Sequence, residues 1–347
     1  GAALLLVSAC AKSEDSGSSS TAGPASSAGA QVAQSADPNA KTCTLEQYGG
    51  QKVDLKTAKV GFSQSEKEAN PFRIAETQSI KDEAAKIGIP TANLQTTNAN
   101  SQFNKQISDV EQMIDSGVQL LVIAPLNSDG WDSVFAKASA KKVPIITIDR
   151  KINATSCTDY LTFIGSDFEE QGKRAADKMA AAMENKGSVA ILLGSPGNNV
   201  TTLRTKGFKD QIAKVAPDIK IVFEQTGQFS REEGQKVSEQ LLQSNADING
   251  IYAENDEMAL GAVTALKGAG KKAGDVKIVS IDGTKGAVQG IIDGWIYSVI
   301  ESNPRFGPLA FQTATKFFNG EPIPEDIIIQ DREYDESNAK ADIGSAY

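Results

Sequence analysis

The chain has 347 residues, a length that allows two hydrophobic cores. It is 40% hydrophobic and 23% charged, which is typical of a globular protein. Its net charge of −9 argues against a nucleic-acid partner, because binding phosphates needs a basic surface. The sequence contains no histidine, which removes Ser-His-Asp and Cys-His catalysis and nearly every His-containing metal site. This absence argues against catalysis without excluding it. The sequence also has no P-loop, no GxGxxG after the first strand and no EF-hand loop, and we expect no metal, no cofactor and no enzymatic activity.

The first residues are typical of an exported protein. Residues 1–10 form an apolar run that ends in Val7-Ser8-Ala9-Cys10 and resembles the truncated end of a bacterial lipoprotein signal. This resemblance makes Cys10 the expected lipidation site. A secretion signal with an incidental cysteine is the alternative, and it also implies export. Residues 11–57 begin with a stretch rich in Ser, Ala and Gly, and we expect them to form a flexible tether and lead-in.

Two further cysteines, Cys43 and Cys157, follow the signal. An exported protein lies in an oxidising compartment, so these two side chains can form a disulfide bond. Two separate thiols are the alternative that the sequence leaves open.

From Ala58 the sequence alternates between apolar strand patterns and amphipathic helix patterns. This alternation predicts βαβ units and parallel sheets, and so an α/β protein. Ten strands suit two similar lobes, each a parallel sheet flanked by helices and joined by a hinge of three crossings. We expect an N-terminal lobe from residues 58–164 plus 302–321, and a C-terminal lobe from 165–301 plus 322–347. The predicted strands are 58–63, 92–95, 120–124, 144–148, 161–165, 189–193, 219–225, 250–253, 277–281 and 295–300.

Polar residues recur directly after these strands. Asp149-Arg150, Asn255-Asp256 and Asp282 each follow a predicted strand. Ligands of parallel α/β sheets bind beyond the carboxyl ends of the strands, so these side chains are predicted to meet in one crevice. Taken singly, each is more simply read as a helix cap or turn residue. For the helix after residue 255, we expect Asp256 to be the N-cap and Asn255 to be the ligand contact.

The loop after the first strand leads into Asn70-Pro71-Phe72-Arg73. Carboxylates, amides and guanidinium groups together suit the vicinal hydroxyls of a sugar. Phe72 and Phe229 could provide flat faces for the C–H side of a sugar ring.

Several short runs combine into a specific pattern. They are Val60-Gly61-Phe62-Ser63-Gln64, residues 144–150, Ser166-Asp167, Arg204-Thr205-Lys206-Gly207-Phe208, Asn255-Asp256-Glu257-Met258-Ala259-Leu260-Gly261-Ala262 and Ser280-Ile281-Asp282-Gly283. Over residues 58–330 the chain resembles the periplasmic sugar-binding proteins of ribose type, the substrate-binding subunits of ABC importers. This resemblance implies a type I binding-protein fold whose two lobes close over one monosaccharide.

The resemblance also implies site residues. Six positions match sugar-contacting residues of that family, namely Arg73, Asp149, Arg150, Arg204, Asn255 and Asp282. Two others, Phe72 and Phe229, match its aromatic walls. Asn70 completes the expected ligand-binding set. One residue of 301–303 is expected to add a contact at a crossing between the lobes.

Two positions indicate the kind of sugar. Ribose binders carry a second Phe at the position of Arg73 and an Asn at that of Ala124. At both positions the chain is similar to the galactofuranose-binding members of the family. It shares further details with them at Phe62-Ser63-Gln64, Gly130-Trp131 and residues 227–231. They favour galactofuranose or a related pentose or hexose.

The sequence thus predicts a monomeric, extracytoplasmic lipoprotein that binds a monosaccharide and delivers it to an ABC permease. A sugar-sensing receptor module with the same lobes remains an alternative. A carbohydrate-active enzyme is a weaker one, because the Arg- and Asn-rich site suits holding hydroxyls better than protonating a leaving oxygen. A LacI-type repressor is remote, because residues 11–57 do not resemble a helix-turn-helix.

Overall fold

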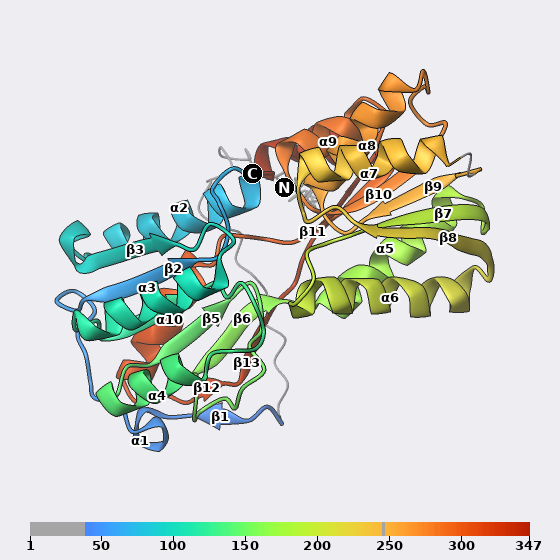
Figure 1. Ribbon diagram of the computed structural model, residues 1–347. Coiled ribbons are helices and arrows are strands. Elements are labelled where there is room, and N and C mark those ends of the chain that lie inside the picture. Colours follow the sequence, from blue (N-terminus) through green and yellow to red (C-terminus); the bar gives the residue numbers. More distant parts are fainter. Residues whose placement is uncertain (1–38, 245–246) are drawn as a thin grey trace, which may run out of the picture.

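The computed structural model describes residues 39–244 and 247–347 of the chain. Two α/β lobes lie side by side, each with helices on both faces of a central sheet (Figure 1). The two-lobed α/β fold is the one predicted from the alternating pattern. The lipidation site predicted at Cys10 and the tether at 11–38 lie outside the described residues.

The first lobe is built on a six-stranded sheet with the order β13-β6-β5-β4-β2-β3, in which every neighbouring pair is parallel. Central strands such as β5 have only buried residues, as expected for a parallel sheet covered on both faces. The strands are β2 (Val60–Gln64), β3 (Leu94–Asn98), β4 (Leu120–Ile123), β5 (Ile145–Ile148), β6 (Thr162–Ser166) and β13 (Asp326–Ile329). The helices are α2 (Pro71–Lys86), α3 (Phe103–Asp115), α4 (Asp132–Lys141) and α10 (Gly307–Phe318), with the 3₁₀ turn η1 (Thr91–Asn93).

The second lobe repeats this plan with the order β14-β11-β10-β9-β7-β8. All of its pairs are parallel except that of β14 with β11, which is antiparallel. The strands are β7 (Lys186–Leu193), β8 (Asp218–Thr226), β9 (Gly250–Ala253), β10 (Lys277–Asp282), β11 (Ser298–Glu301) and β14 (Glu333–Asp335). The helices are α5 (Phe168–Ala182), α6 (Asn199–Val215), α7 (Arg231–Gln243), α8 (Asp256–Gly268), α9 (Lys285–Ile292) and α11 (Ala339–Asp342), with the 3₁₀ turn η2 (Ile343–Ser345).

Helices α5 and α6 pack closely because glycines lie at their contact. A Cβ atom on Gly172 would lie 2.3 Å from the carbonyl oxygen of Arg204, and one on Gly207 would lie 2.1 Å from that of Glu169. Only glycine permits this approach. The contact fixes the position of α6, which carries Arg204.

One predicted boundary is wrong. The sequence pattern predicts that residues 322–347 belong as a whole to the C-terminal lobe, but β13 pairs in parallel with β6 of the first lobe. The apolar side chains of Ile327 and Ile329 are buried in the core of the first lobe, which holds the strand there. Only the segment from β14 onward belongs to the second lobe.

The chain therefore passes between the lobes three times within the described residues, after β6, after β11 and after β13. The predicted hinge of three crossings is confirmed. Its strands are tied together by Asp331, whose Oδ2 accepts from Gln171 Nε2 at 2.9 Å and whose Oδ1 accepts from the backbone N–H of Asn303 at 3.2 Å. These bonds link the second and third crossings to α5, the helix that follows the first crossing.

A small two-stranded sheet closes the far end of the first lobe. Strand β1 (Thr42–Cys43) pairs antiparallel with β12 (Ile323–Pro324), just before the short helix α1 (Leu45–Tyr48). Cys43 and Cys157 form a disulfide bond with their Cα atoms 5.4 Å apart, so the predicted bond is confirmed. The lead-in before Ala58 is thus partly folded against the first lobe.

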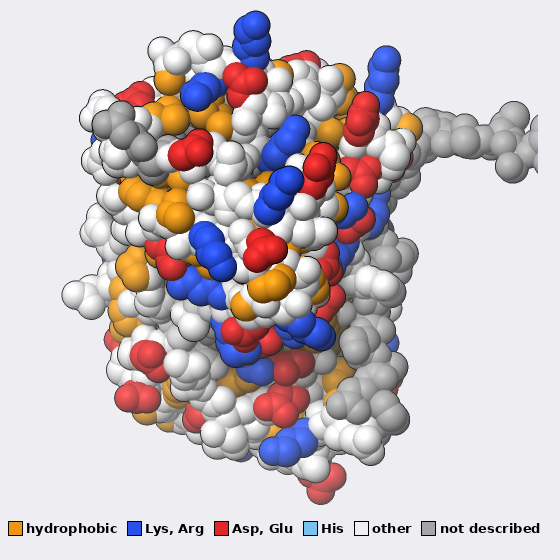
Figure 2. Space-filling view, turned by 90° about the vertical axis from the view of Figure 1, so that its right-hand side faces the viewer, with side chains coloured by type: hydrophobic (Ala, Val, Ile, Leu, Met, Phe, Trp, Pro, Cys, Tyr) orange, Lys and Arg blue, Asp and Glu red, His pale blue; other side chains and the backbone are white. Residues whose placement is uncertain are grey.

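The side of the second lobe that faces the viewer in Figure 2 has the mixed charges of a solvated surface. Figure 2 shows basic and acidic side chains interspersed there, and pairs such as Lys206 with Asp210 lie at 2.9 Å. Exposed pairs of this kind stabilise a fold by only about 0–1 kcal/mol. Among the described residues, no helix combines the length and apolar character that a membrane span requires.

Candidate functional site

A cavity lies between the lobes at the carboxyl ends of both sheets. All nine residues of the predicted ligand-binding set line it, and two further residues join them. The lining residues are Glu66, Asn70, Phe72, Arg73, Asp149, Arg150, Val200, Arg204, Phe229, Asn255 and Asp282. Parallel sheets in both lobes explain this convergence, since they bring the carboxyl ends of their strands to one edge.

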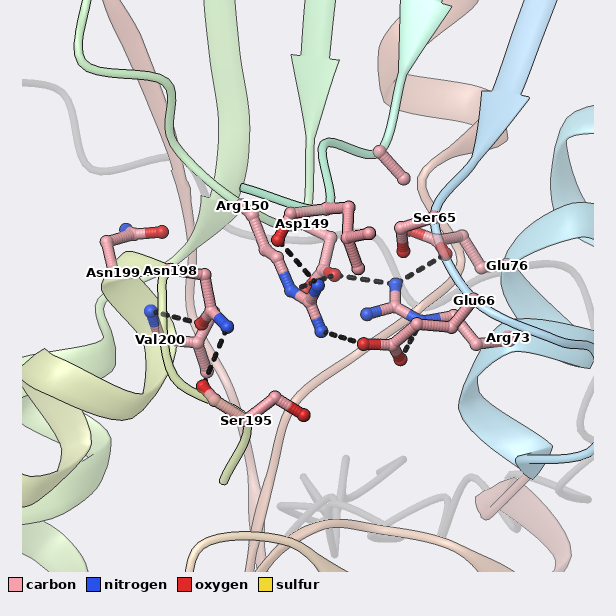
Figure 3. A network of polar contacts seen from close by, with 12 residues as sticks. Ser65, Glu66, Arg73, Glu76, Asp149, Arg150, Ser195, Asn198, Asn199 and Val200 are labelled. Carbon is pink, nitrogen blue, oxygen red and sulfur yellow. Dashed lines mark hydrogen bonds and ion pairs between the residues drawn. The ribbon is translucent and has the colours of Figure 1, made fainter. Parts of the chain in front are cut away.

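The first lobe contributes two arginines held by carboxylates (Figure 3). Arg73 Nη1 donates to Asp149 Oδ2 at 2.6 Å and to Glu76 Oε2 at 2.8 Å. The carboxylate of Glu66 accepts from Arg73 Nε at 3.2 Å and from Arg150 Nη2 at 2.7 Å. The arginines are nearly fully buried, so these bonds are of the charge-assisted, strong kind.

Local backbone structure positions these side chains. The side chain of Asn70 caps α2, accepting from the backbone N–H of Phe72 at 2.9 Å, and Pro71 suits the first turn. This start places Arg73 in the first turn of the helix, at the cavity. Asp149 follows β5 with a φ of 65°, a left-handed conformation that Asp tolerates, and this turn directs its carboxylate toward Arg73.

The second lobe contributes Arg204, Asn255 and Asp282. Arg204 Nη1 donates to the carbonyl oxygen of Glu254 at 2.6 Å, and its Nε donates to Gln171 Oε1 at 2.9 Å. Its Nη2 lies 3.7 Å from Asp282 Oδ1. This guanidinium group is therefore fixed by a strand end and a helix of its own lobe.

The roles predicted for Asn255 and Asp256 need a correction. The N-cap of α8 is Asn255 and not Asp256. Oδ1 of Asn255 accepts from the backbone N–H of Met258 at 3.0 Å. The buried carboxylate of Asp256 instead accepts from Ser280 Oγ at 2.6 Å and from the backbone N–H groups of Gly283 and Thr284 at 2.8 Å. Asp256 thus fixes the loop that carries Asp282, while Asn255 both caps the helix and lines the cavity.

Two aromatic rings line the cavity from opposite lobes. The ring centroid of Phe72 lies 5.0 Å from Cζ of Arg73, and that of Phe229 lies 5.8 Å from Cζ of Arg150. Phe229 has a φ of 55°, which is rare for an aromatic residue and costs about 1–3 kcal/mol of strain. The Nδ2 of Asn255 donates to the Phe229 carbonyl oxygen at 3.1 Å and holds it in place.

The lobes are closed over the cavity. The backbone N–H of Ser128 donates to the Gly197 carbonyl oxygen at 3.2 Å, and that of Lys151 to Asn199 Oδ1 at 3.0 Å. Within this closed arrangement the cavity has a volume of about 30 Å³. A single water molecule needs about 10–15 Å³, so the free space is small. Most of the side chains that line it are charged or polar.

Burial and neighbouring charges shift the pKa values of these carboxyl groups in opposite directions. Burial raises the pKa of Glu66, but the charges of Arg150 and Arg73 outweigh it and lower the pKa to about 2. Burial raises the pKa of Glu76 to about 7 and that of Asp282 well above its ordinary value. Glu66 is therefore a permanent negative charge at neutral pH.

The comparisons with known proteins place the chain in a family. A model of the periplasmic binding protein domain matches residues 60–322. The chain belongs to the periplasmic binding protein family.

Relatives of this periplasmic binding protein include proteins of known structure. It is similar to the galactofuranose-binding protein YtfQ of Escherichia coli, with 34% identity over 277 residues that cover 78% of this chain and 85% of YtfQ. A Mycobacterium smegmatis structure in complex with β-D-fucofuranose is 36% identical with a TM-score of 0.78, covering 82% of this chain and 93% of that one. The binding component of the arabinose ABC transporter of Shewanella sp. ANA-3, bound to α- and β-L-arabinofuranose, is 32% identical with a TM-score of 0.78, covering 82% and 94%.

Glu66 and Val200 are the lining residues of this periplasmic binding protein that the sequence prediction missed. Glu66 lies in the loop after β2, whose course no periodic pattern sets, although its place just beyond a strand end was a usable signal. Val200 is the second residue of α6, just after the loop that follows β7 and ends at the Asn198 cap. Residues 301–303, expected to supply one contact, lie buried in the hinge and are not part of the cavity lining.

Proposed function

We propose that this periplasmic binding protein captures a monosaccharide outside the cytoplasm and delivers it to an ABC permease. The observation that carries the proposal is the lining of the cavity. Arginine, carboxylate, amide and aromatic side chains from both lobes face one space. Guanidinium groups donate to sugar oxygens, carboxylates accept from hydroxyls, and Phe72 and Phe229 offer apolar faces to the ring. The named relatives support the same class of ligand.

The mechanism follows from the hinge. With the lobes apart, a sugar contacts the arginines and carboxylates of one lobe. Contacts with Arg204, Asn255, Asp282 and Phe229 on the other lobe form only on closure. The sugar therefore favours the closed state through the contacts that exist only there, and the permease distinguishes closed from open.

For the identity of the sugar, we propose galactofuranose or a related furanose. Arg73 supports this choice, because it places a guanidinium group where ribose binders carry an aromatic ring. The relatives above are named for or bound to galactofuranose, fucofuranose and arabinofuranose. A five-membered ring with an exocyclic side chain is the feature these ligands share.

We also propose that the protein is a monomer anchored by a lipid on Cys10. The run Val7-Ser8-Ala9-Cys10 supports lipidation, and the Ser- and Gly-rich residues after it would give the lobes reach from the membrane surface. Mass spectrometry of the full chain expressed in a bacterium tests this point. A diacylglyceryl mass on Cys10, lost in Cys10→Ser, is the expected result, and an unmodified Cys10 would contradict it.

A thermal-shift screen against pentoses and hexoses tests the ligand class. A ligand that binds only the folded state raises the unfolding midpoint, by an amount set by its concentration relative to its Kd. We expect furanose-forming sugars such as D-galactose and L-arabinose to raise the midpoint. If no monosaccharide does so, the proposed ligand class is wrong. Mass spectrometry of the sugar after long incubation should find it unchanged, as for a binding protein and unlike an enzyme.

A further inference from the structure

Glu66 joins the two arginines of the first lobe through a single carboxylate. Its Oε1 accepts from Arg150 at 2.7 Å and its Oε2 from Arg73 at 3.2 Å. Figure 3 shows this carboxylate lying between the two guanidinium groups. Glu66 also lines a second pocket, which it shares with Lys67, Leu126 and Ser230, so it lies where this pocket meets the cavity.

This bridge does not depend on closure of the lobes. Glu66, Arg73, Asp149 and Arg150 all belong to the first lobe, on β2, α2 and β5 or the residues that follow them. Opening the hinge separates them from the second lobe and leaves their mutual bonds in place. An arriving sugar therefore meets two arginines that already have negatively charged partners.

The charges of the first lobe explain what Glu66 contributes. Arg73 and Arg150 carry two positive charges, and the carboxylates of Glu66 and Asp149 oppose them. Glu76 also contacts Arg73, at 2.8 Å. On the opposite wall, Arg204 faces Asp282 at 3.7 Å. Without Glu66, Arg150 would keep only Asp149, 3.7 Å from its Nε, as a carboxylate partner in the described residues.

The arginines still have donors for neutral hydroxyls. Arg150 Nε is buried without a hydrogen-bond partner in the described residues, and none of the hydrogen bonds described for Arg73 uses its Nη2. A hydroxyl oxygen can accept from these groups without displacing Glu66. A carboxylate of a sugar acid would meet the charge of Glu66 at the same place, and like charges in a site of low dielectric repel strongly.

We propose that Glu66 is a specificity-determining residue that excludes anionic sugars, such as uronic and aldonic acids, from the arginine pair and so restricts the site to neutral monosaccharides. This inference rests on the proposed function. Arg73 and Arg150 then have a use in a site for uncharged ligands. Their charges hold the carboxylates of Glu66 and Asp149, and their remaining N–H groups bind hydroxyls.

The test compares D-galactose with D-galacturonate, which differ at C6 by a hydroxymethyl group and a carboxylate. Titration calorimetry measures both ligands with the wild-type protein, Glu66→Gln and Glu66→Ala. Glu68→Gln is the matched control, because Glu68 is an exposed carboxylate in the same loop. Thermal unfolding of each variant establishes that it is folded.

In the wild-type protein we expect D-galactose to bind and D-galacturonate to bind at least a hundredfold more weakly. In Glu66→Gln the ratio of the D-galactose affinity to the D-galacturonate affinity should fall at least tenfold, whatever the change in the D-galactose affinity itself, and Glu68→Gln should leave both affinities unchanged. If D-galactose binds and the ratio of the two affinities is the same in Glu66→Gln as in the wild type, the role of Glu66 is wrong and the sugar-binding function stands. If the wild type binds no neutral monosaccharide, the proposed function itself fails, and this inference with it.

Discussion

Arg73 and Asp149 are 76 residues apart in the sequence, yet Nη1 of Arg73 lies 2.6 Å from Oδ2 of Asp149 in the wall of the cavity. Arg73 follows β2 and Asp149 follows β5, the first and fourth strands of the six-stranded sheet in chain order. Their pairing fixes a guanidinium group that would otherwise have several rotamers. Each of these two side chains therefore depends on the other for its orientation toward a ligand.

Asp149→Asn should lower the affinity for the sugar more than tenfold. The substitution keeps the shape of the side chain and removes its charge, and hydrogen bonds to charged groups contribute about 1.5–3 kcal/mol each. Titration calorimetry measures the effect, with Asp82→Asn on the exposed face of α2 as a control. An unchanged affinity in Asp149→Asn would remove Asp149 from the binding site.

Asp256→Ala should destabilise the protein by about 3 kcal/mol, because the buried donors of Ser280, Gly283 and Thr284 would lose their acceptor. The free energy of unfolding in urea measures this loss. Asp177→Ala, at an exposed position on α5, should change it by less than about 0.5 kcal/mol. Equal stabilities of the two variants would show that Asp256 does not hold the loop after β10.

Removing the disulfide by Cys157→Ala should lower the free energy of unfolding by about 2–4 kcal/mol, since the bond joins residues 114 positions apart and restricts the unfolded chain. Urea unfolding with and without a reductant provides the measurement. The wild-type protein should lose stability in the reductant, and Cys157→Ala should not respond to it. A wild-type protein that is equally stable in both conditions would contradict the structural role of this bond.

Glu254 should make stability fall as the pH rises. Burial raises the pKa of Glu254 from 4.5 to about 7, so the folded protein holds a proton that the unfolded chain has released. Unfolding therefore releases this proton between pH 4.5 and 7. The stabilising contribution is complete below pH 4.5 and is lost as the pH rises through about 7.

Glu254→Gln tests this dependence, because glutamine resembles the protonated acid beside Gly194 and Thr205. The fall in unfolding free energy between pH 5 and 7 should become shallower by up to about 1.4 kcal/mol per pH unit. Urea unfolding at pH 5, 6 and 7 measures the slope. The exposed Glu239→Gln should keep the wild-type slope, and an equal slope in Glu254→Gln would contradict the raised pKa.

Much of the cavity could be predicted because its residues follow strands. Asp149, Asn255 and Asp282 follow apolar runs whose ends are visible in the sequence, and a parallel sheet brings such ends together. Glu66 escaped prediction because it lies in an irregular loop and acts through two side chains that are distant in sequence. Nothing periodic in the loop indicates the direction of its side chain.

Two of the sequence predictions are wrong at positions where the local sequence fits either outcome. Asn255 and Asp256 are adjacent residues that both suit a helix N-cap, so composition alone could not decide which of them caps α8. The run Ile327-Ile328-Ile329 is apolar enough for either sheet, and only its pairing with β6 assigns it to the first lobe. Both outcomes depend on tertiary contacts.

The return of β13 to the first lobe has a consequence for synthesis of the chain. The sheet of that lobe is complete only with residues 326–329, which a ribosome adds after the whole second sheet except β14. Domains made of one continuous segment can fold in order as they emerge. Synthesis of the first lobe begins before that of the second lobe, but its last strand, β13, is added late. The edge of its sheet at β6 therefore has no partner strand while the second lobe is translated. Until β13 is in place, an unpaired edge of this kind can pair with other extended chains.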